Sequence, residues 1–352
     1  MTKPIQIKNL TIGAGIPKIC VPLTGTTEEK ICQEAKDAKK AGADLVEWRA
    51  DFFEGLMDKE ACKQVLGKLS EILGETPLLF TIRTSEEGGN IAISMKDYSA
   101  CCRNAARSHI ADLVDVEVMG NPEEKKKLVA ELQREGVKII ASSHDFDKTD
   151  SQEILLDRFR EMEKSGADIL KMAVMPHGFE DVAAIMEATN AMRKECEKPL
   201  VSMAMGSIGS ISRISGENFG SGITFGTVGA ASAPGQFPIG ELRSLLEALH
   251  QKLSFRQRGG GIAITVPVSG MQSHVMQMLN EEARNAIQQQ EKGDEAQMKE
   301  KSEFSLIWVS VASGYSDDVV DVARAAGARG VCRFEHRHAL RARRSRADGK
   351  RH

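Results

Sequence analysis

The sequence predicts an α/β protein, with a (β/α)8 TIM barrel over residues 1–254 and a small C-terminal α+β module of ferredoxin-like type. Short β-rich runs alternate along the chain with longer segments of helical period. Each run is continuously apolar, which is typical of strands covered on both faces. Eight such runs lie between residues 18 and 226, which fits a barrel of roughly 250 residues.

The predicted strands follow one another at regular intervals. They are residues 18–23, 44–49, 77–83, 112–118, 137–144, 168–174, 198–204 and 223–226. Gly42 and Gly166 end helical segments just before the next strand. Ahead of the first strand, IQIKNLTIGAG predicts a small hairpin that closes the bottom of the barrel. A doubly wound open sheet is the competing architecture, but no GxGxxG follows the first strand.

The barrel pattern ends with a predicted helix over residues 240–254, and a linker over 255–261 interrupts all periodicity with RQRGGG. Beyond it, residues 262–335 alternate strand and helix patterns, which predicts a βαβαβ module. The segment 336–352 is basic and without periodicity, so we predict a disordered tail.

Composition excludes several classes of function. The net charge of −3 gives no reason to expect a nucleic-acid partner. The seven cysteines include no CxxC pair, so neither a disulfide framework nor a thiolate metal cage is indicated. Nowhere do 18 apolar residues run together, and the N-terminus has no apolar leader. We therefore expect a cytoplasmic protein that does not engage a membrane.

Polar residues follow the predicted strands at the ends that converge on one mouth of a barrel. The candidate site residues are Glu47, Arg49, Arg83, Glu87, His144, Lys171, Arg213, Ser232 and Gln236.

Lys171 is the most informative of these, because it lies inside the apolar run ILKMAVM. Burial of an ammonium lowers its pKa and frees amine that attacks a carbonyl group. The alternative is a lysine whose head reaches solvent or pairs with a carboxylate. His144 ends the preceding strand and suits a general base beside an iminium-forming lysine, with a structural histidine as the alternative. Glu87 either fixes the His144 tautomer or is a solvated carboxylate in a turn.

Three arginines at one mouth suit an anionic substrate, since a guanidinium binds a carboxylate in a bidentate manner. For Arg49 and Arg83 the alternative is structural ion pairs with Glu47 and Asp51. Arg213 has fewer acidic neighbours in the sequence and is the best candidate for a carboxylate anchor. The segment SAPGQ, with Ser232 and Gln236, predicts a mobile lid.

A magnesium site is a competing interpretation of the same mouth. Its oxygen ligands would be Glu47, Asp51, Glu117 and Asp145. No HxH or HExxH accompanies these acids, and arginines crowd them, so a site without a metal or a cofactor is favoured.

Six motifs at successive strand ends carry a resemblance to a known family. They are VEWRADFF, FTIRTSEEGG, SSHDF, ADILKMAVMP, SRISGENFGSGITFG and SAPGQ. In this order and spacing the chain resembles type I 3-dehydroquinate dehydratase over about residues 1–254. The resemblance implies a lyase that converts 3-dehydroquinate to 3-dehydroshikimate in the shikimate pathway of aromatic amino acid biosynthesis. The implied partner is this small-molecule substrate, with a homodimer as a possible assembly.

The resemblance also assigns roles by matching position. It implies that Lys171 forms the Schiff base, that His144 is the general acid and base, and that Glu87 is the partner of His144. Arg213 is implied to hold the substrate carboxylate. The residues implied to face the ring hydroxyls are Glu47, Arg49 and Arg83, and those of the closing loop are Ser232 and Gln236.

The C-terminal module is similar to nitrogen-regulatory P-II-like proteins through SGYSDDVVDVARAAGARG, over about residues 262–335. After Gly330 the glycine-rich strand of that family is replaced by VCRFEHRH, so a packing or oligomerisation appendage is the alternative. Two further hypotheses for the whole chain stay open at this point. One is a class I aldolase or transaldolase, and the other is a non-enzymatic barrel that serves as scaffold for the module.

Overall fold

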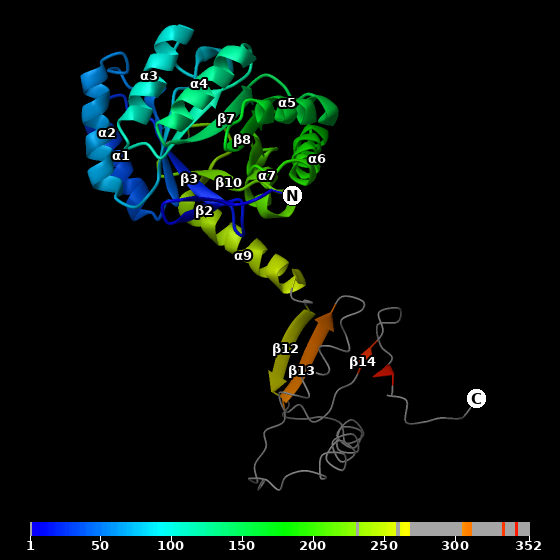
Figure 1. Cartoon of the computed structure of the whole chain (residues 1–352). Helices are drawn as coiled ribbons and strands as arrows, with labels where there is room; N and C mark the ends of the chain where they lie inside the picture. The colour runs from blue at the N-terminus through cyan, green and yellow to red at the C-terminus, as the bar shows by residue number, and fades with distance from the viewer. Residues whose placement is uncertain are drawn as a thin grey trace, which may run out of the picture. The chain divides into compact units, whose positions relative to one another are not determined.

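The computed structural model describes residues 2–229 and 232–257, together with short strands farther along the chain. It divides into two compact units, Met1–Gln251 and Lys252–His352, which we describe separately (Figure 1).

Eight parallel strands form the centre of the first unit, in the order β10-β3-β4-β5-β6-β7-β8-β9. They are β3 (Lys18–Leu23), β4 (Leu45–Arg49), β5 (Leu78–Thr81), β6 (Leu113–Glu117), β7 (Lys138–Asp145), β8 (Ile169–Val174), β9 (Leu200–Ala204) and β10 (Ile223–Thr227). The two ends of this series meet, because the Gly222 amide donates to the Leu200 carbonyl at 2.7 Å. A two-residue strand, β11 (Phe237–Pro238), runs parallel to the end of β10. The arrangement is a TIM-like barrel, and all eight predicted strands are present.

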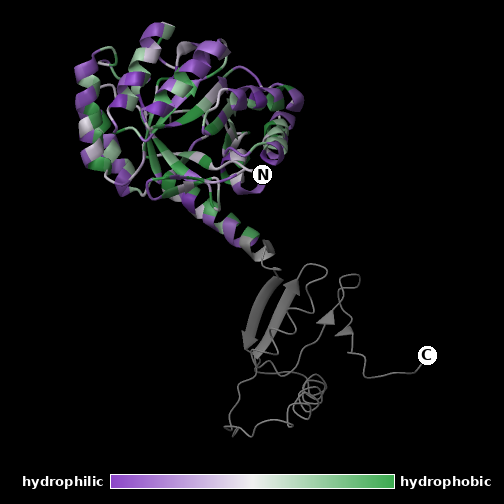
Figure 2. Cartoon of the chain, in the orientation of Figure 1, coloured by the Kyte–Doolittle hydropathy of each residue, from purple (hydrophilic) through white to green (hydrophobic). Residues whose placement is uncertain are grey.

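Helices cover the outside of this sheet (Figure 1). The six longer ones between strands are α1 (Glu28–Lys40), α2 (Lys59–Leu73), α3 (Met95–Arg107), α4 (Pro122–Arg134), α5 (Gln152–Lys164) and α6 (Phe179–Glu195). Two short helices, α7 (Ser210–Ile214) and α8 (Gly216–Phe219), follow β9, and α9 (Ile239–Gln257) ends the barrel. The helices turn hydrophilic residues outward and the strands are largely hydrophobic (Figure 2).

Side-chain oxygens begin several of these helices, as their sequences lead one to expect. Asp58 accepts the amides of Glu60 and Ala61 before α2, and Ser94 accepts the amide of Asp97 before α3. Each cap satisfies amides that have no partner within the helix.

The barrel interior is apolar at the bottom and polar at the mouth. Alternate residues of each strand face the barrel axis. The first inward layer is apolar and includes Leu45, Leu79, Leu113, Ile140, Ile169 and Val201. The hairpin of β1 (Ile5–Ile7) and β2 (Leu10–Ile12) packs Ile7 and Ile12 into this layer. This confirms the small hairpin that was predicted to close the bottom of the barrel. The next inward positions carry polar and charged side chains, so the chemistry is confined to the open end.

The second unit contains two antiparallel strand pairs among its described residues. β12 (Gly261–Pro267) pairs with β13 (Ser305–Val311), and β14 (Arg333–Phe334) pairs with β15 (Ala342–Arg343). The first pair agrees with the strand patterns of the module predicted over residues 262–335, and β15 lies in the segment predicted to be a disordered tail. The helices predicted for this module lie outside the described residues, and the ferredoxin-like and P-II-like interpretations stay predictions. In the part of the chain that is described, none of the helices has the length and apolarity needed to cross a membrane.

Candidate active site

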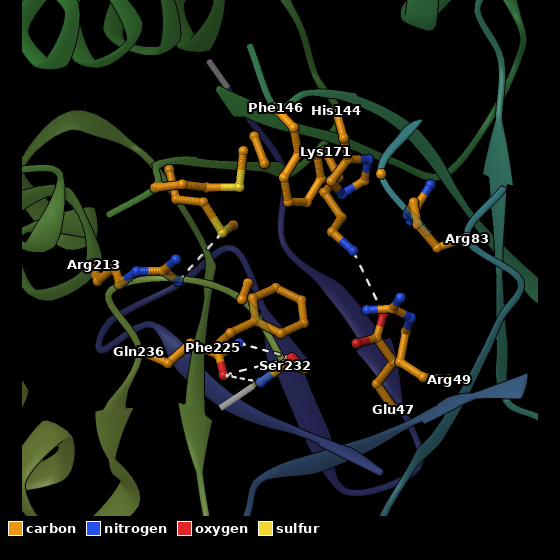
Figure 3. A pocket seen from close by; sticks show the side chains of 15 residues that line it. Glu47, Arg49, Arg83, His144, Phe146, Lys171, Arg213, Phe225, Ser232 and Gln236 are labelled. Atoms are coloured by element: carbon orange, nitrogen blue, oxygen red, sulfur yellow. Dashed lines mark hydrogen bonds and ion pairs between the residues drawn. The ribbon is translucent and has the colours of Figure 1, made fainter. Parts of the chain in front are cut away.

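A cavity opens at the mouth of the barrel, where the carboxyl ends of the strands converge (Figure 3). Eight of the predicted site residues line it, namely Glu47, Arg49, Arg83, His144, Lys171, Arg213, Ser232 and Gln236. The ninth, Glu87, contacts His144. The fold therefore brings together residues that lie almost 190 positions apart in the sequence.

Lys171 projects from β8 into the barrel and is only 4% exposed. Its Nζ lies 3.2 Å from Asp115 Oδ2 and 3.6 Å from Glu47 Oε1, and 4.7 Å from the centre of the Phe225 ring. The lysine is thus buried and paired with carboxylates, which combines features of both interpretations offered by the sequence. Two carboxylates and an aromatic face stabilise positive charge on this nitrogen.

Asp115 on β6 is a site residue that the sequence reasoning missed. It is fully buried, and its Oδ1 accepts hydrogen bonds from Arg83 Nη2 at 2.9 Å and from Ser142 Oγ at 2.5 Å. Burial raises the pKa of Asp115, but the positive charges of Arg83 and Lys171 lower it by more. The pKa of Asp115 therefore lies below its ordinary value. The available signal was the one that singled out Lys171, a charged residue inside an apolar strand.

His144 lies next to Lys171 because β7 and β8 pair in register. Ser142 is opposite Lys171, and His144 is two residues farther along the same inward face. The His144 Nδ1 atom is 2.9 Å from Glu87 Oε2, which also accepts the His144 amide at 2.9 Å. Burial lowers the pKa of His144 well below its ordinary value, and the positive charges of Arg83, Lys171 and Arg49 lower it further. The imidazole is therefore neutral at physiological pH.

Glu87 reaches His144 from a 3-10 turn, Ser85–Glu87, that two glycines make feasible. Gly88 has a φ of +77°, and an added Cβ at Gly89 would collide with the Arg83 carbonyl. Burial raises the pKa of Glu87 to about 8, although the Arg83 guanidinium opposes this increase. The carboxyl is largely buried and contacts the imidazole, unlike the solvated turn residue that was the alternative.

Arg83 lies within a network of carboxylates. Its guanidinium pairs with Asp115 at 2.9 Å, Glu117 at 2.8 Å and Glu87 at 3.3 Å. The alternative offered for Arg83, structural ion pairs, is therefore present, but with partners other than Glu47 and Asp51. The inward positions of the next strand lie closer to Arg83, and Asp51 accepts only its backbone amide.

Arg49 forms the bidentate ion pair with Asp51 that the sequence offered as an alternative, with two N–O distances of 2.8 Å. Its guanidinium still lines the cavity. Asp51 therefore orients this arginine at the mouth of the barrel.

Arg213 differs from the other two arginines. It is 1% exposed, and among the described residues its guanidinium donates to the Pro234 carbonyl at 2.9 Å and to the Met203 sulfur at 3.6 Å. Its Nε has no hydrogen-bond partner, and no carboxylate in the described ranges pairs with it. Burial lowers its pKa to about 10. A buried cation without a counterion is costly, so Arg213 is suited to receive an anion from outside.

The loop before β11 closes on itself beside the cavity. Gln236 accepts the Ser232 amide through Oε1 and donates to Ser232 Oγ through Nε2, both at 3.0 Å. The Pro234 carbonyl accepts hydrogen bonds from Arg213 and from the Gly206 amide. Opening of this loop as a lid stays a prediction.

The acids proposed as magnesium ligands are engaged by other partners. Asp51 pairs with Arg49, Glu117 binds Arg83 and the Thr84 hydroxyl, and Asp145 accepts two loop amides. Within the described residues no group of three His, Cys, Asp or Glu side chains is arranged to hold a metal ion.

Comparisons with known proteins agree with the motifs. The family model described as type I 3-dehydroquinase matches residues 19–253. A 3-dehydroquinate dehydratase of Klebsiella pneumoniae is 43% identical over 250 residues, which is 71% of this chain and 100% of the relative. Among solved structures, the type I 3-dehydroquinate dehydratase of Clostridium difficile with covalent modified comenic acid is 42% identical, with a TM-score of 0.69. The match covers 72% of this chain and 100% of the Clostridium difficile chain. The enzyme of Geobacillus kaustophilus is 39% identical, also with a TM-score of 0.69, over 71% of this chain and 97% of that one.

Proposed function

The chain belongs to the type I 3-dehydroquinase family, and we propose that it dehydrates 3-dehydroquinate through a Schiff base on Lys171, with His144 as general acid and base. The enzyme is a lyase of the shikimate pathway. The matched region is the barrel, so we assign the activity to the barrel rather than to the C-terminal module. Three further properties remain predictions: catalysis without a cofactor, a cytoplasmic location and a homodimeric assembly.

The placement of three groups around one cavity is the observation that carries this proposal. Lys171 supplies a nucleophilic nitrogen, His144 supplies a neutral base on the adjacent strand, and Arg213 supplies a buried cation without a counterion. The Clostridium difficile relative contains a covalently modified comenic acid. That finding supports covalent chemistry with a small organic acid in a relative of this chain.

The reaction begins when the unprotonated Nζ of Lys171 attacks the C3 carbonyl carbon of the substrate. The resulting carbinolamine takes up a proton from solvent and loses water, which leaves a cationic imine. Asp115 and Glu47 stabilise this cation by their negative charges. The cationic imine withdraws electrons from C2 and makes the C2 proton acidic.

His144 then removes that C2 proton, and the C–H electron pair forms an enamine. Electrons from the enamine expel the hydroxyl group at C1, which takes the proton from His144 and leaves as water. A second water hydrolyses the imine, which restores the ketone and the Lys171 amine and releases the proton taken up during imine formation. The water lost in imine formation is regained in hydrolysis, so the net change is the loss of one water.

Glu87 prepares His144 for this role. If its carboxylate accepts a hydrogen bond from the protonated Nδ1, the lone pair on Nε2 is free to act as the base. A proton on Glu87 would reverse this hydrogen bond and place the ring proton on Nε2. The Glu87–His144 pair therefore acts as a base only after it has lost this proton.

The pH dependence of kcat/KM should reveal the loss of this proton from the Glu87–His144 pair. Burial raises the pKa of Glu87 to about 8, so kcat/KM is expected to rise with pH through an apparent pKa near that value. Glu87→Gln removes the titrating carboxyl, so we expect a lower plateau and an acid limb that moves to lower pH. The exposed neighbour variant Glu86→Gln should keep the wild-type profile. An identical acid limb in Glu87→Gln and wild type, measured from pH 5 to 10, would exclude this role.

Arg213→Gln tests the carboxylate anchor. Loss of a charge-assisted bidentate contact should raise KM by about 100-fold, with a smaller effect on kcat. The variant also removes an uncompensated buried cation, so Tm should not fall. Arg160→Gln is the matched control, because Arg160 pairs with Glu195 on the surface. Steady-state kinetics that leave KM for Arg213→Gln within threefold of wild type would contradict the assignment.

The proposed function is tested by supplying 3-dehydroquinate to the purified chain and following the ultraviolet absorbance of the conjugated product. We expect absorbance to appear and to persist after treatment with a metal chelator. If a folded protein produced no change in absorbance, the proposed function would be wrong.

A further inference from the structure

We propose that Asp115 is a positioning residue of this reaction, which holds Lys171 Nζ in the cavity and stabilises the positive charge of the imine nitrogen. The inference rests on the proposed Schiff-base function. Asp115 does not line the cavity, so it acts through Lys171 rather than by touching the substrate.

The carboxylate of Asp115 divides its two oxygens between different partners. Oδ1 accepts from Arg83 Nη2 at 2.9 Å and from Ser142 Oγ at 2.5 Å. Oδ2 accepts from Lys171 Nζ at 3.2 Å. Because Arg83 and Ser142 fix one oxygen, the other is held in a set direction and constrains the end of the flexible lysine side chain.

The backbone of Asp115 is anchored in an unusual way. The pairing of β5 with β6 ends at Phe80 opposite Val114, so the next backbone groups of β6 lack a strand neighbour on that side. The buried hydroxyl of Tyr98, on α3, replaces the missing strand as the partner of these groups. It donates a hydrogen bond to the Asp115 carbonyl at 3.4 Å and accepts one from the Glu117 amide at 3.1 Å. Tyr98 therefore holds the backbone of β6 on both sides of the Asp115 side chain and fixes the position of the Asp115 carboxylate.

Several charged or titratable groups act on Lys171, and they differ in distance. They are Asp115 from β6, Glu47 from β4, His144 from β7, Cys20 from β3, and Arg83 through its contact with Asp115. Asp115 is the nearer of the two carboxylates, while Glu47 also accepts from the Thr81 hydroxyl. The charge of Asp115 stabilises the cationic imine that forms on this nitrogen.

Loss of this charge therefore has two effects on catalysis. The cationic imine is less stable, so kcat falls. The nitrogen is also held less firmly in the cavity, so the imine forms more slowly. A residue that served only as counterion for Arg83 would produce neither effect on the lysine.

Glu117 provides the matched control. It lies two residues farther along the same face of β6 and pairs with the same Arg83 guanidinium at 2.8 Å. Among the described ion pairs it has none with Lys171. Glu117→Gln thus removes a carboxylate from Arg83 without removing one from the lysine.

The experiment measures the rate of single-turnover imine formation, trapped by borohydride, together with kcat and KM in the full chain. For Asp115→Asn we expect kcat to fall by about 100-fold, KM to stay within about threefold, and imine formation to slow by about 10-fold or more. Glu117→Gln should form the imine at close to the wild-type rate. Equal rates for Asp115→Asn and wild type, or equal losses in both variants, would overturn the inference. If wild type forms no imine, the proposed function itself fails.

Ser142→Ala keeps the test available if Asp115→Asn does not fold. This variant removes one hydrogen bond that orients the Asp115 carboxylate but leaves its charge. We expect kcat to fall by about 2–10-fold, the worth of one such bond, with KM unchanged. An unchanged kcat in this variant would count against positioning by Asp115.

Discussion

Replacement of Lys171 by alanine is expected to lower kcat by about 10⁴-fold or more, because it removes the nucleophile that forms the covalent intermediate. No other described lysine lines the cavity, so none can replace it. Substrate and product should still bind, since the Arg213 guanidinium remains in place. Isothermal titration with the product measures that binding separately from turnover.

The control for this variant is Lys138→Ala. Lys138 begins β7 at the opposite end of the barrel and pairs with Asp168 near the surface. Its loss should leave kcat and KM close to wild type. Lys171→Ala also leaves Glu47 and Asp115 without their shared cation, so Tm must be measured with the kinetics. A folded Lys171→Ala variant that retained a tenth of the wild-type kcat would refute the covalent route.

Replacement of His144 by alanine is expected to lower kcat by about 10²–10⁴-fold, the usual contribution of a general acid and base. The Lys171 nitrogen remains in the cavity, so imine formation should still be detectable. The two variants are therefore distinguished by trapping: His144→Ala gives a borohydride adduct, and Lys171→Ala gives none.

His250→Ala is the matched control for the histidine. His250 lies on α9 and pairs with Glu217, away from the residues that line the cavity. It should turn over as wild type does. If His144→Ala retained the wild-type rate of proton loss from C2, measured with substrate deuterated at that carbon, His144 would not be the base.

The barrel and its two most informative residues could be predicted from the sequence for a simple reason. Lys171 interrupts one apolar run and His144 ends the run before it, and parallel strands in register place their inward side chains side by side. The hairpin plug was predictable for a similar reason, since Ile7 and Ile12 are apolar residues beside a short turn.

Side-chain partners were less predictable. Long side chains choose among neighbours from different strands, so Arg83 pairs with acids of the following strand instead of Glu47 and Asp51. Asp115 was missed because its run was read as uniformly apolar. Alternation of inward and outward positions places residue 115 in the same inward layer as Lys171, and that period was the overlooked signal.

Mass spectrometry of the chain after borohydride treatment with 3-dehydroquinate is the most direct measurement of the proposed chemistry. Reduction of the imine should leave the ligand skeleton attached to the peptide that contains Lys171, and the adduct should be absent from Lys171→Ala. A turning-over enzyme that acquires no mass, or acquires it on another residue, would show that the reaction does not proceed through this lysine.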